Sequence, residues 1–146
     1  MSGDMTRPLP VALCLAFVAL ALWHFYMALI PGSGTAGALP SADGKPLFVP
    51  TRKATFAVGA VLLLFSALVA ATAGMIPVGL PRGALSWLSY ALAAGLMARA
   101  VGEFKYVGFF KRVHGTKFAR LDTLLYSPLC LLLGVGVALV ALHNTR

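Results

Sequence analysis

Residues 56–76 read FAVGAVLLLFSALVAATAGMI, and these 21 residues include no Lys, Arg, His, Asp or Glu. A helix on the surface of a soluble protein needs a polar face, and this stretch offers none. About 20 apolar residues are enough to cross the roughly 30 Å hydrocarbon core of a bilayer. The stretch therefore predicts a transmembrane helix and excludes a helix of a very apolar soluble bundle.

Three further apolar stretches flank this one along the 146-residue chain, which is 60% apolar and only 11% charged. A soluble domain carries about a quarter charged residues. The sequence thus predicts an all-α polytopic membrane protein, a single membrane domain over residues 1–146 folded as a four-transmembrane-helix bundle. We expect an amphipathic cytoplasmic segment between helices 3 and 4. The predicted helices span about 9–30, 55–76, 84–104 and 117–143, with a kink near 128.

The beginning of the last helix has two interpretations. Ser127 followed by Pro128 suits an N-cap and a first helical position, which would leave only about 16 residues, short for a span. The alternative is a helix that begins near Thr116 and kinks at Pro128. We favour the kink because Leu124 and Leu125 continue the apolar run.

Basic residues are unevenly divided between the two sides that four helices define. One side has three, at positions 7, 82 and 146. The other side has eight: Lys45, Arg52, Lys53, Lys105, Lys111, Arg112, Lys117 and Arg120. Because basic loops mark the cytoplasmic side, we expect both termini outside and the two long loops in the cytoplasm. The first apolar stretch is longer than the 7–15 residues of a signal-peptide core, so we expect it to remain as a helix.

Residues 99–128, RAVGEFKYVGFFKRVHGTKFARLDTLLYSP, are the richest in chemistry. They hold six of the twelve basic residues, two of the four acidic ones and six of the thirteen Phe and Tyr residues. Cations interleaved with aromatic rings are typical of a segment on a membrane surface, where they meet anionic headgroups. Membrane lipids are therefore the expected partners. We expect no nucleic acid, since the segment is tethered between two spans.

The predicted topology gathers the polar residues of the helix ends on the cytoplasmic side. Arg99 is too deep to stay unpaired, so it should pair with Glu103 one turn later, with Asp122 or with an anionic ligand. An internal salt bridge between helices 3 and 4 is the structural alternative. The candidate ligand-binding residues are Arg99, Glu103, Lys105, Tyr106, Asp122, Tyr126, His24 and Tyr26.

Three residues are candidates for catalysis. Glu103 and Asp122 would form a general acid and base pair if they were close, although Asp122 would also serve as a helix cap. His24 is a candidate proton carrier, or a core histidine with a structural partner. It has no second His or Cys nearby, so we expect no metal site, and nothing in the sequence indicates a cofactor.

Two stretches, RAVGEFKYVGFFKR at 99–112 and TKFARLDTLLYSPLC at 116–130, carry a resemblance, together with His24, Phe25 and Tyr26. On these residues the chain is similar to an uncharacterised family of small bacterial integral membrane proteins with four predicted transmembrane helices. The resemblance implies the four-helix architecture and a place in the bacterial inner membrane. It implies no reaction.

We interpret the protein as one that binds an anionic or amphiphilic small molecule, or a lipid headgroup, in a polar pocket facing the cytoplasm. Arg99 and Lys105 would bind the anion. A membrane enzyme that uses Glu103 or Asp122 on a lipid-soluble substrate is an alternative, so the sequence leaves open whether the protein is an enzyme. A small proton-coupled transporter and an accessory subunit are further alternatives, and a homo- or hetero-oligomer is compatible with each.

Overall fold

The computed structural model describes residues 8–30, 32 and 35–145, so Arg7 and Arg146 of the count by side lie outside the described part. The described residues include four helices long and apolar enough to cross a membrane. The chain is therefore an all-α, multi-pass membrane protein. The four helices are α1 (Pro8–Leu29), α3 (Arg52–Thr72), α4 (Arg82–Val101) and the continuous helical stretch Lys117–Asn144.

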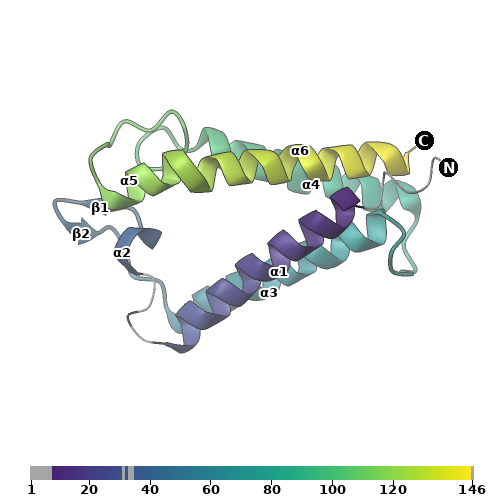
Figure 1. Cartoon of the computed structure of the whole chain (residues 1–146), viewed down its shortest axis with the longest axis horizontal. Helices are drawn as coiled ribbons and strands as arrows, with labels where there is room; N and C mark the ends of the chain where they lie inside the picture. Colours follow the sequence, from purple (N-terminus) through teal and green to yellow (C-terminus); the bar gives the residue numbers. More distant parts are fainter. Residues whose placement is uncertain (1–7, 31, 33–34, 146) are drawn as a thin grey trace.

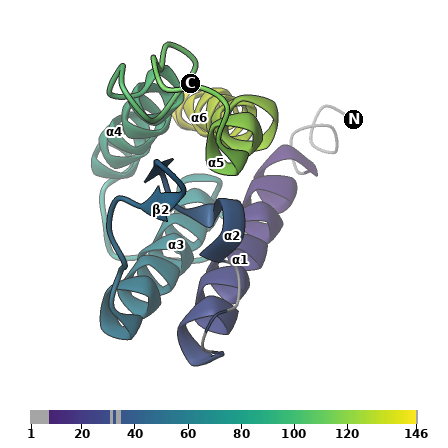
Figure 2. The same cartoon turned by 90° about the vertical axis from the view of Figure 1, so that its left-hand side faces the viewer.

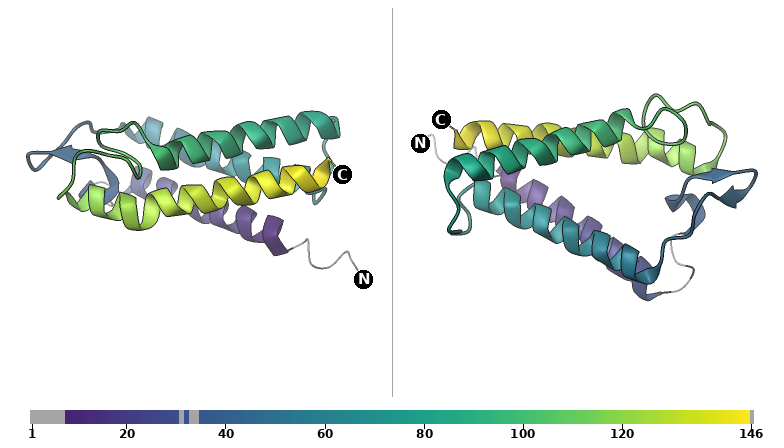
Figure 3. Two further views of the ribbon diagram at one scale, coloured as in Figure 1. Left: turned by 90° about the horizontal axis from the view of Figure 1, so that it is seen from above. Right: turned by 180° about the vertical axis from the view of Figure 1, so that it is seen from behind.

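Two antiparallel helix pairs make up the molecule. α1 packs along α3, and α4 packs along α6 (Ser127–Asn144), with fewer contacts between the pairs than within them. The pairs meet near the chain termini and diverge toward the two long loops (Figure 1). The view from behind shows the same divergence (Figure 3). At the loop end, the helix termini of the two pairs therefore lie apart from each other.

The core lies where the two pairs meet. It is made of apolar side chains from all four helices: Leu13, Phe17, Val69, Ala93, Leu133, Val137 and Val140. Gly136 permits the close approach of α6 to α1, since a Cβ there would lie 2.8 Å from Cδ2 of Leu13. Small residues let helices in lipid approach closely, where dispersion contacts replace the hydrophobic effect as the source of stability.

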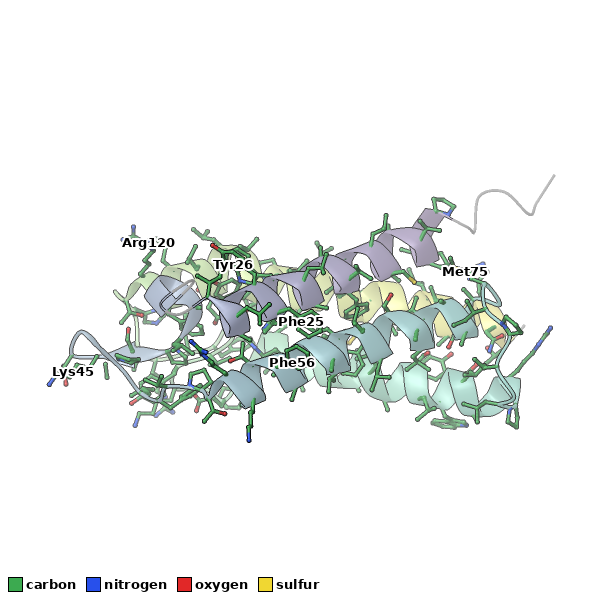
Figure 4. All side chains as sticks on the ribbon, turned by 90° about the horizontal axis from the view of Figure 1, so that it is seen from below. Phe25, Tyr26, Lys45, Phe56, Met75 and Arg120 are labelled. Atoms are coloured by element: carbon green, nitrogen blue, oxygen red, sulfur yellow. The ribbon has the colours of Figure 1, made fainter. Side chains whose placement is uncertain are left out.

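The α1–α3 pair is joined by aromatic and polar contacts. The rings of Phe25 and Phe56 lie 4.7 Å apart and point toward one another (Figure 4). Next to them, Gly59 lies against the ring of Phe25. Further along, the hydroxyl of Ser66 donates to the carbonyl of Cys14 at 3.2 Å. Each of these contacts joins a residue of α1 to a residue of α3.

Helix boundaries follow local capping signals. The hydroxyl oxygen of Thr51 accepts from the backbone N–H of Ala54, so α3 begins at Arg52, before the predicted 55. α3 ends at Thr72 rather than 76. α4 ends at Val101, three residues before the predicted 104, because Gly102 adopts a φ of 86°. The prediction that Glu103 continues this helix is wrong for that reason.

The last helix has the unusual beginning that the proline imposes. It starts at Lys117 after the N-cap Thr116, as α5 (Lys117–Leu121), and passes through the π-helical turn η1 (Asp122–Tyr126) into α6. The N–H of Ser127 bonds the carbonyl of Asp122, five residues back. A proline has no N–H to donate and its ring crowds the preceding turn, so a wider turn accommodates it. The irregularity therefore lies just before Pro128, next to Asp122.

The loop between α1 and α3 contains short elements of secondary structure, and these lie at the loop end of the molecule. They are α2 (Thr35–Ala38) and the two antiparallel strands β1 (Ser41–Ala42) and β2 (Lys45–Pro46). Viewed from the loop end, α2 lies beside α5 (Figure 2). The hydroxyl of Tyr126 donates to the carbonyl of Gly37 at 3.0 Å, which ties α2 to the last helix.

Candidate functional site

Residues 102–116, between α4 and α5, are non-helical and fold back over the end of α4. Two glycines make this fold possible. Gly102 and Gly108 have φ values of 86° and 91°, and a Cβ on either would collide with backbone of the other's segment. The N–H of Phe109 donates to the carbonyl of Ala100 at 2.9 Å, which satisfies one carbonyl at the helix end. That this segment also lies on the membrane surface stays a prediction.

The carboxylate of Asp122, at the start of η1, is completely buried. Its Oδ1 accepts from Nη2 of Arg99 at 2.8 Å. Its Oδ2 accepts from the N–H of Gly108 at 2.6 Å and from Nζ of Lys111 at 3.2 Å. The three donors come from α4 and from the returning loop, so one carboxylate fastens both to the last helix.

Lys111 is the second buried charge, with no exposed side-chain surface. Its Nζ donates to the carbonyl of Gly108 at 2.9 Å and to the hydroxyl of Thr123 at 2.5 Å, in addition to Asp122. The Thr123 hydroxyl in turn donates to the carbonyl of Ala119 at 3.1 Å. An ammonium group has three protons to donate, and all three have acceptors here.

The cluster formed by Arg99, Lys111 and Asp122 carries an excess of positive charge. It contains two cations and one carboxylate. The side chain of Arg99 is 35% exposed, whereas those of Lys111 and Asp122 are 0% exposed. Nη1 of Arg99 and Oγ of Ser127 are buried and have no hydrogen-bond partner among the described residues. Arg99 is thus the charged residue of the cluster whose side chain is partly exposed and whose guanidinium has a donor without a partner among the described residues.

The structure brings together only part of the predicted site. Arg99 and Asp122 form the ion pair that was one of the three expected alternatives, with Tyr126 one turn further along. Sequence reasoning missed Lys111, Gly108 and Thr123. Lys105 and Lys111 both follow a phenylalanine in the same basic stretch, so no local signal separates the exposed lysine from the buried one.

Glu103, Lys105 and Tyr106 form a separate surface turn. Oε1 of Glu103 accepts from the N–H of Tyr106 at 2.6 Å, and Nζ of Lys105 lies 5.0 Å from the centre of the Tyr106 ring. Glu103 makes no hydrogen bond or ion pair with Arg99 or Asp122 among the described residues. The expected helical pair of Arg99 and Glu103 is therefore absent.

His24 and Tyr26 belong to the other helix pair. Nδ1 of His24 lies 2.7 Å from the carbonyl oxygen of Leu20, one turn earlier on α1. The ring of Tyr26 stacks on Trp23 at 5.6 Å, and both side chains are about half exposed. In the described part of the chain, neither His24 nor Tyr26 has a hydrogen bond or ion pair with the Asp122 cluster. The described residues contain no group of three or more His, Cys, Asp or Glu side chains that could hold a metal ion.

Comparison with known proteins places this arrangement in a family. Residues 17–137 match the model of a family described as a protein of unknown function, DUF3995. The chain belongs to the DUF3995 family. The DUF3995 match includes Arg99, Lys111 and Asp122 and reaches into all four long helices. No curated protein matches the chain, and no solved structure does. The DUF3995 description assigns no activity, so function must be argued from the residues.

Proposed function

We propose that the protein binds the anionic group of an amphiphilic small molecule or lipid headgroup at the loop end of the α4–α6 pair. Arg99 makes the main contact. The observation that carries this proposal is the charge balance of the buried cluster, two cations to one carboxylate, with Nη1 of Arg99 unpaired. The resident carboxylate neutralises one cation, and an anionic ligand would neutralise the other.

Physical costs favour such a ligand. A buried donor without an acceptor costs roughly 1–3 kcal/mol, and a charge-assisted bond to an anionic oxygen removes that cost. A guanidinium presents its donors in a planar fork that suits phosphate and carboxylate groups. The side chain of Arg99 is partly exposed, and Lys105, exposed in the loop that follows α4, is a further cation.

The direct test compares lipid-dependent stability in two arginine variants. The full chain, purified in a neutral detergent, is melted with phosphatidylglycerol and with phosphatidylcholine. A ligand at a hundred times its Kd stabilises by roughly 2.7 kcal/mol. We expect phosphatidylglycerol to stabilise the wild type and the control Arg120→Gln, whose side chain is exposed, by clearly more than it stabilises Arg99→Gln. Circular dichroism must show the same helix content in all three. An Arg99→Gln response equal to that of the wild type would refute the proposal.

The membrane and the orientation are part of the proposal. The protein is placed in the bacterial inner membrane, with both termini outside and the two long loops in the cytoplasm. Support comes from the eight basic residues of the long loops, against three on the opposite side. Fluorescent-protein and alkaline-phosphatase fusions at the C-terminus test it. Only the phosphatase fusion should be active, and the reverse result would invert the orientation.

Acid–base catalysis and proton-coupled transport receive less support from the geometry. Both need a carboxylate that exchanges protons. Asp122 is buried and accepts from three donors. Glu103 is exposed and accepts from the backbone of its own turn. Among the hydrogen bonds of the described residues, none joins the two acids, so anion binding remains the function that the contacts support best.

A further inference from the structure

A second basic site is present on the other helix pair, where α1 ends and α3 begins. A hollow of about 350 Å³ lies there, lined by Ala28, Leu29, Arg52, Lys53 and Phe56. None of these residues belongs to the Asp122 cluster or to its loop. The hollow is therefore a different site from the one that contains Arg99.

The lining is divided into an apolar part and a cationic part. Leu29 is 70% exposed, and the ring of Phe56 is backed by the ring of Phe25 (Figure 4). Arg52 and Lys53 are exposed, and neither has an ion-pair partner in the part of the chain that the structure describes. The first turn of α3 contains no acidic residue. The hollow thus combines apolar side chains with two cations that have no acidic partner among the described residues.

The place of the hollow along the helices matches the layers of a bilayer. Leu29 is the last residue of α1 and Arg52 the first of α3, so both mark the end of a membrane-spanning segment. Phe56 lies one helical turn further into the span than Arg52. The cations thus stand at the level of lipid headgroups, and the apolar residues stand where acyl chains begin. The positive end of the α3 dipole adds to the same field.

We propose that this hollow binds an anionic phospholipid of the surrounding leaflet. Arg52 and Lys53 hold the phosphate, and Leu29 and Phe56 contact the first part of the acyl chains. The volume accommodates a headgroup and the adjoining carbons, while the rest of the chains stays in the bilayer. A phosphate ion satisfies only the cationic part of this site, whereas phosphatidylcholine satisfies the apolar part but brings no net negative charge to the two cations.

The test counts lipids bound to the delipidated full chain by native mass spectrometry. The chain is titrated in neutral detergent with phosphatidylglycerol, phosphatidylcholine or sodium phosphate. Each cation near a headgroup contributes about 1 kcal/mol, so the double variant R52Q/K53Q should bind phosphatidylglycerol roughly 25-fold more weakly. The charge-matched control R112Q/R120Q, in which both replaced side chains are exposed, should bind as the wild type does.

Each other outcome has a definite meaning. An equal loss in the control would show diffuse attraction to a basic surface and would overturn the proposal. Displacement of the lipid by millimolar phosphate would reduce the site to an anion site and overturn the assignment to a lipid. The variant Leu29→Asn should weaken phosphatidylglycerol binding. Unchanged binding would contradict the proposed contact between Leu29 and the acyl chains. The variant Arg99→Gln should not change phosphatidylglycerol binding at the Arg52 hollow. The proposal for this hollow and the proposal for the Arg99 site can therefore fail independently.

Discussion

Nζ of Lys111 lies 3.2 Å from Oδ2 of Asp122, and both side chains are fully buried. This pair joins a non-helical loop to the π-helical turn of the last helix. Buried ion pairs often add little net stability, but breaking one by removing a single partner leaves an uncompensated charge. The architecture of the loop end therefore depends on both residues being present together.

The first prediction follows from that dependence. Asp122→Asn removes the only carboxylate of the cluster and leaves Lys111 and Arg99 facing each other without a counter-ion. We expect a loss of about 3–5 kcal/mol in the free energy of unfolding, measured by denaturation in mixed micelles. Lys111→Met should cost less, because Arg99 and Gly108 still bind the carboxylate. The double variant should recover part of the loss, and strictly additive losses would contradict the pairing.

The second prediction concerns the glycines of the returning loop. Gly108 and Gly115 have similar positive φ values, 91° and 86°, but only Gly108 lies against other backbone. Gly115→Ala should cost only the roughly 1–2 kcal/mol of a left-handed backbone with a side chain. Gly108→Ala should cost clearly more, because its Cβ collides with the carbonyl of Val101 and displaces the N–H that binds Asp122. Thermal unfolding of the two variants side by side makes the comparison, and equal costs would show that the close approach does not matter.

The loop end marks the limit of what the sequence could predict. Uncharged stretches of about 20 residues were enough to predict four spans and the fold class. Thr116 and Pro128 were enough to predict a helix that starts before the proline and is irregular near it. These features are local, set by hydrocarbon thickness, capping and the missing proline N–H.

The buried cluster depends on contacts between distant segments, and the sequence predicted only one of its pairs. Arg99 had three expected partners, and choosing Asp122 required knowing that α4 stops at Val101. Gly102 gave a signal for that stop, because glycine commonly ends helices. Lys111 gave none, since its burial results from how the loop folds back. His24 was assigned to the same side, but the divergence of the helix pairs separates it from the cluster.

The third prediction tests the tie between α2 and the last helix. Tyr126→Phe removes the hydroxyl that donates to the carbonyl of Gly37 and keeps the ring contact with Phe118. We expect a modest loss of about 0.5–1.5 kcal/mol and faster cleavage of residues 39–50 by an added protease. Tyr90→Phe is the matched control, because no hydrogen bond of the Tyr90 hydroxyl is seen among the described residues. Unchanged cleavage in Tyr126→Phe would show that this hydrogen bond does not hold the loop.

The fourth prediction compares two glycines within spans, Gly59 of α3 and Gly95 of α4, for which the structure gives opposite expectations. A Cβ on Gly59 would lie 2.5 Å from the ring of Phe25, whereas one on Gly95 meets nothing within 4 Å. Alanine is favoured over glycine inside helices by roughly 0.5–1 kcal/mol, so Gly95→Ala should be neutral or stabilising. Gly59→Ala should destabilise, because Phe25 must move away and lose its contact with Phe56. Since Phe56 lines the hollow beside Arg52, Gly59→Ala should also weaken phosphatidylglycerol binding there. Equal melting temperatures of the two alanine variants would show that Phe25 can move away from Gly59 without loss of stability.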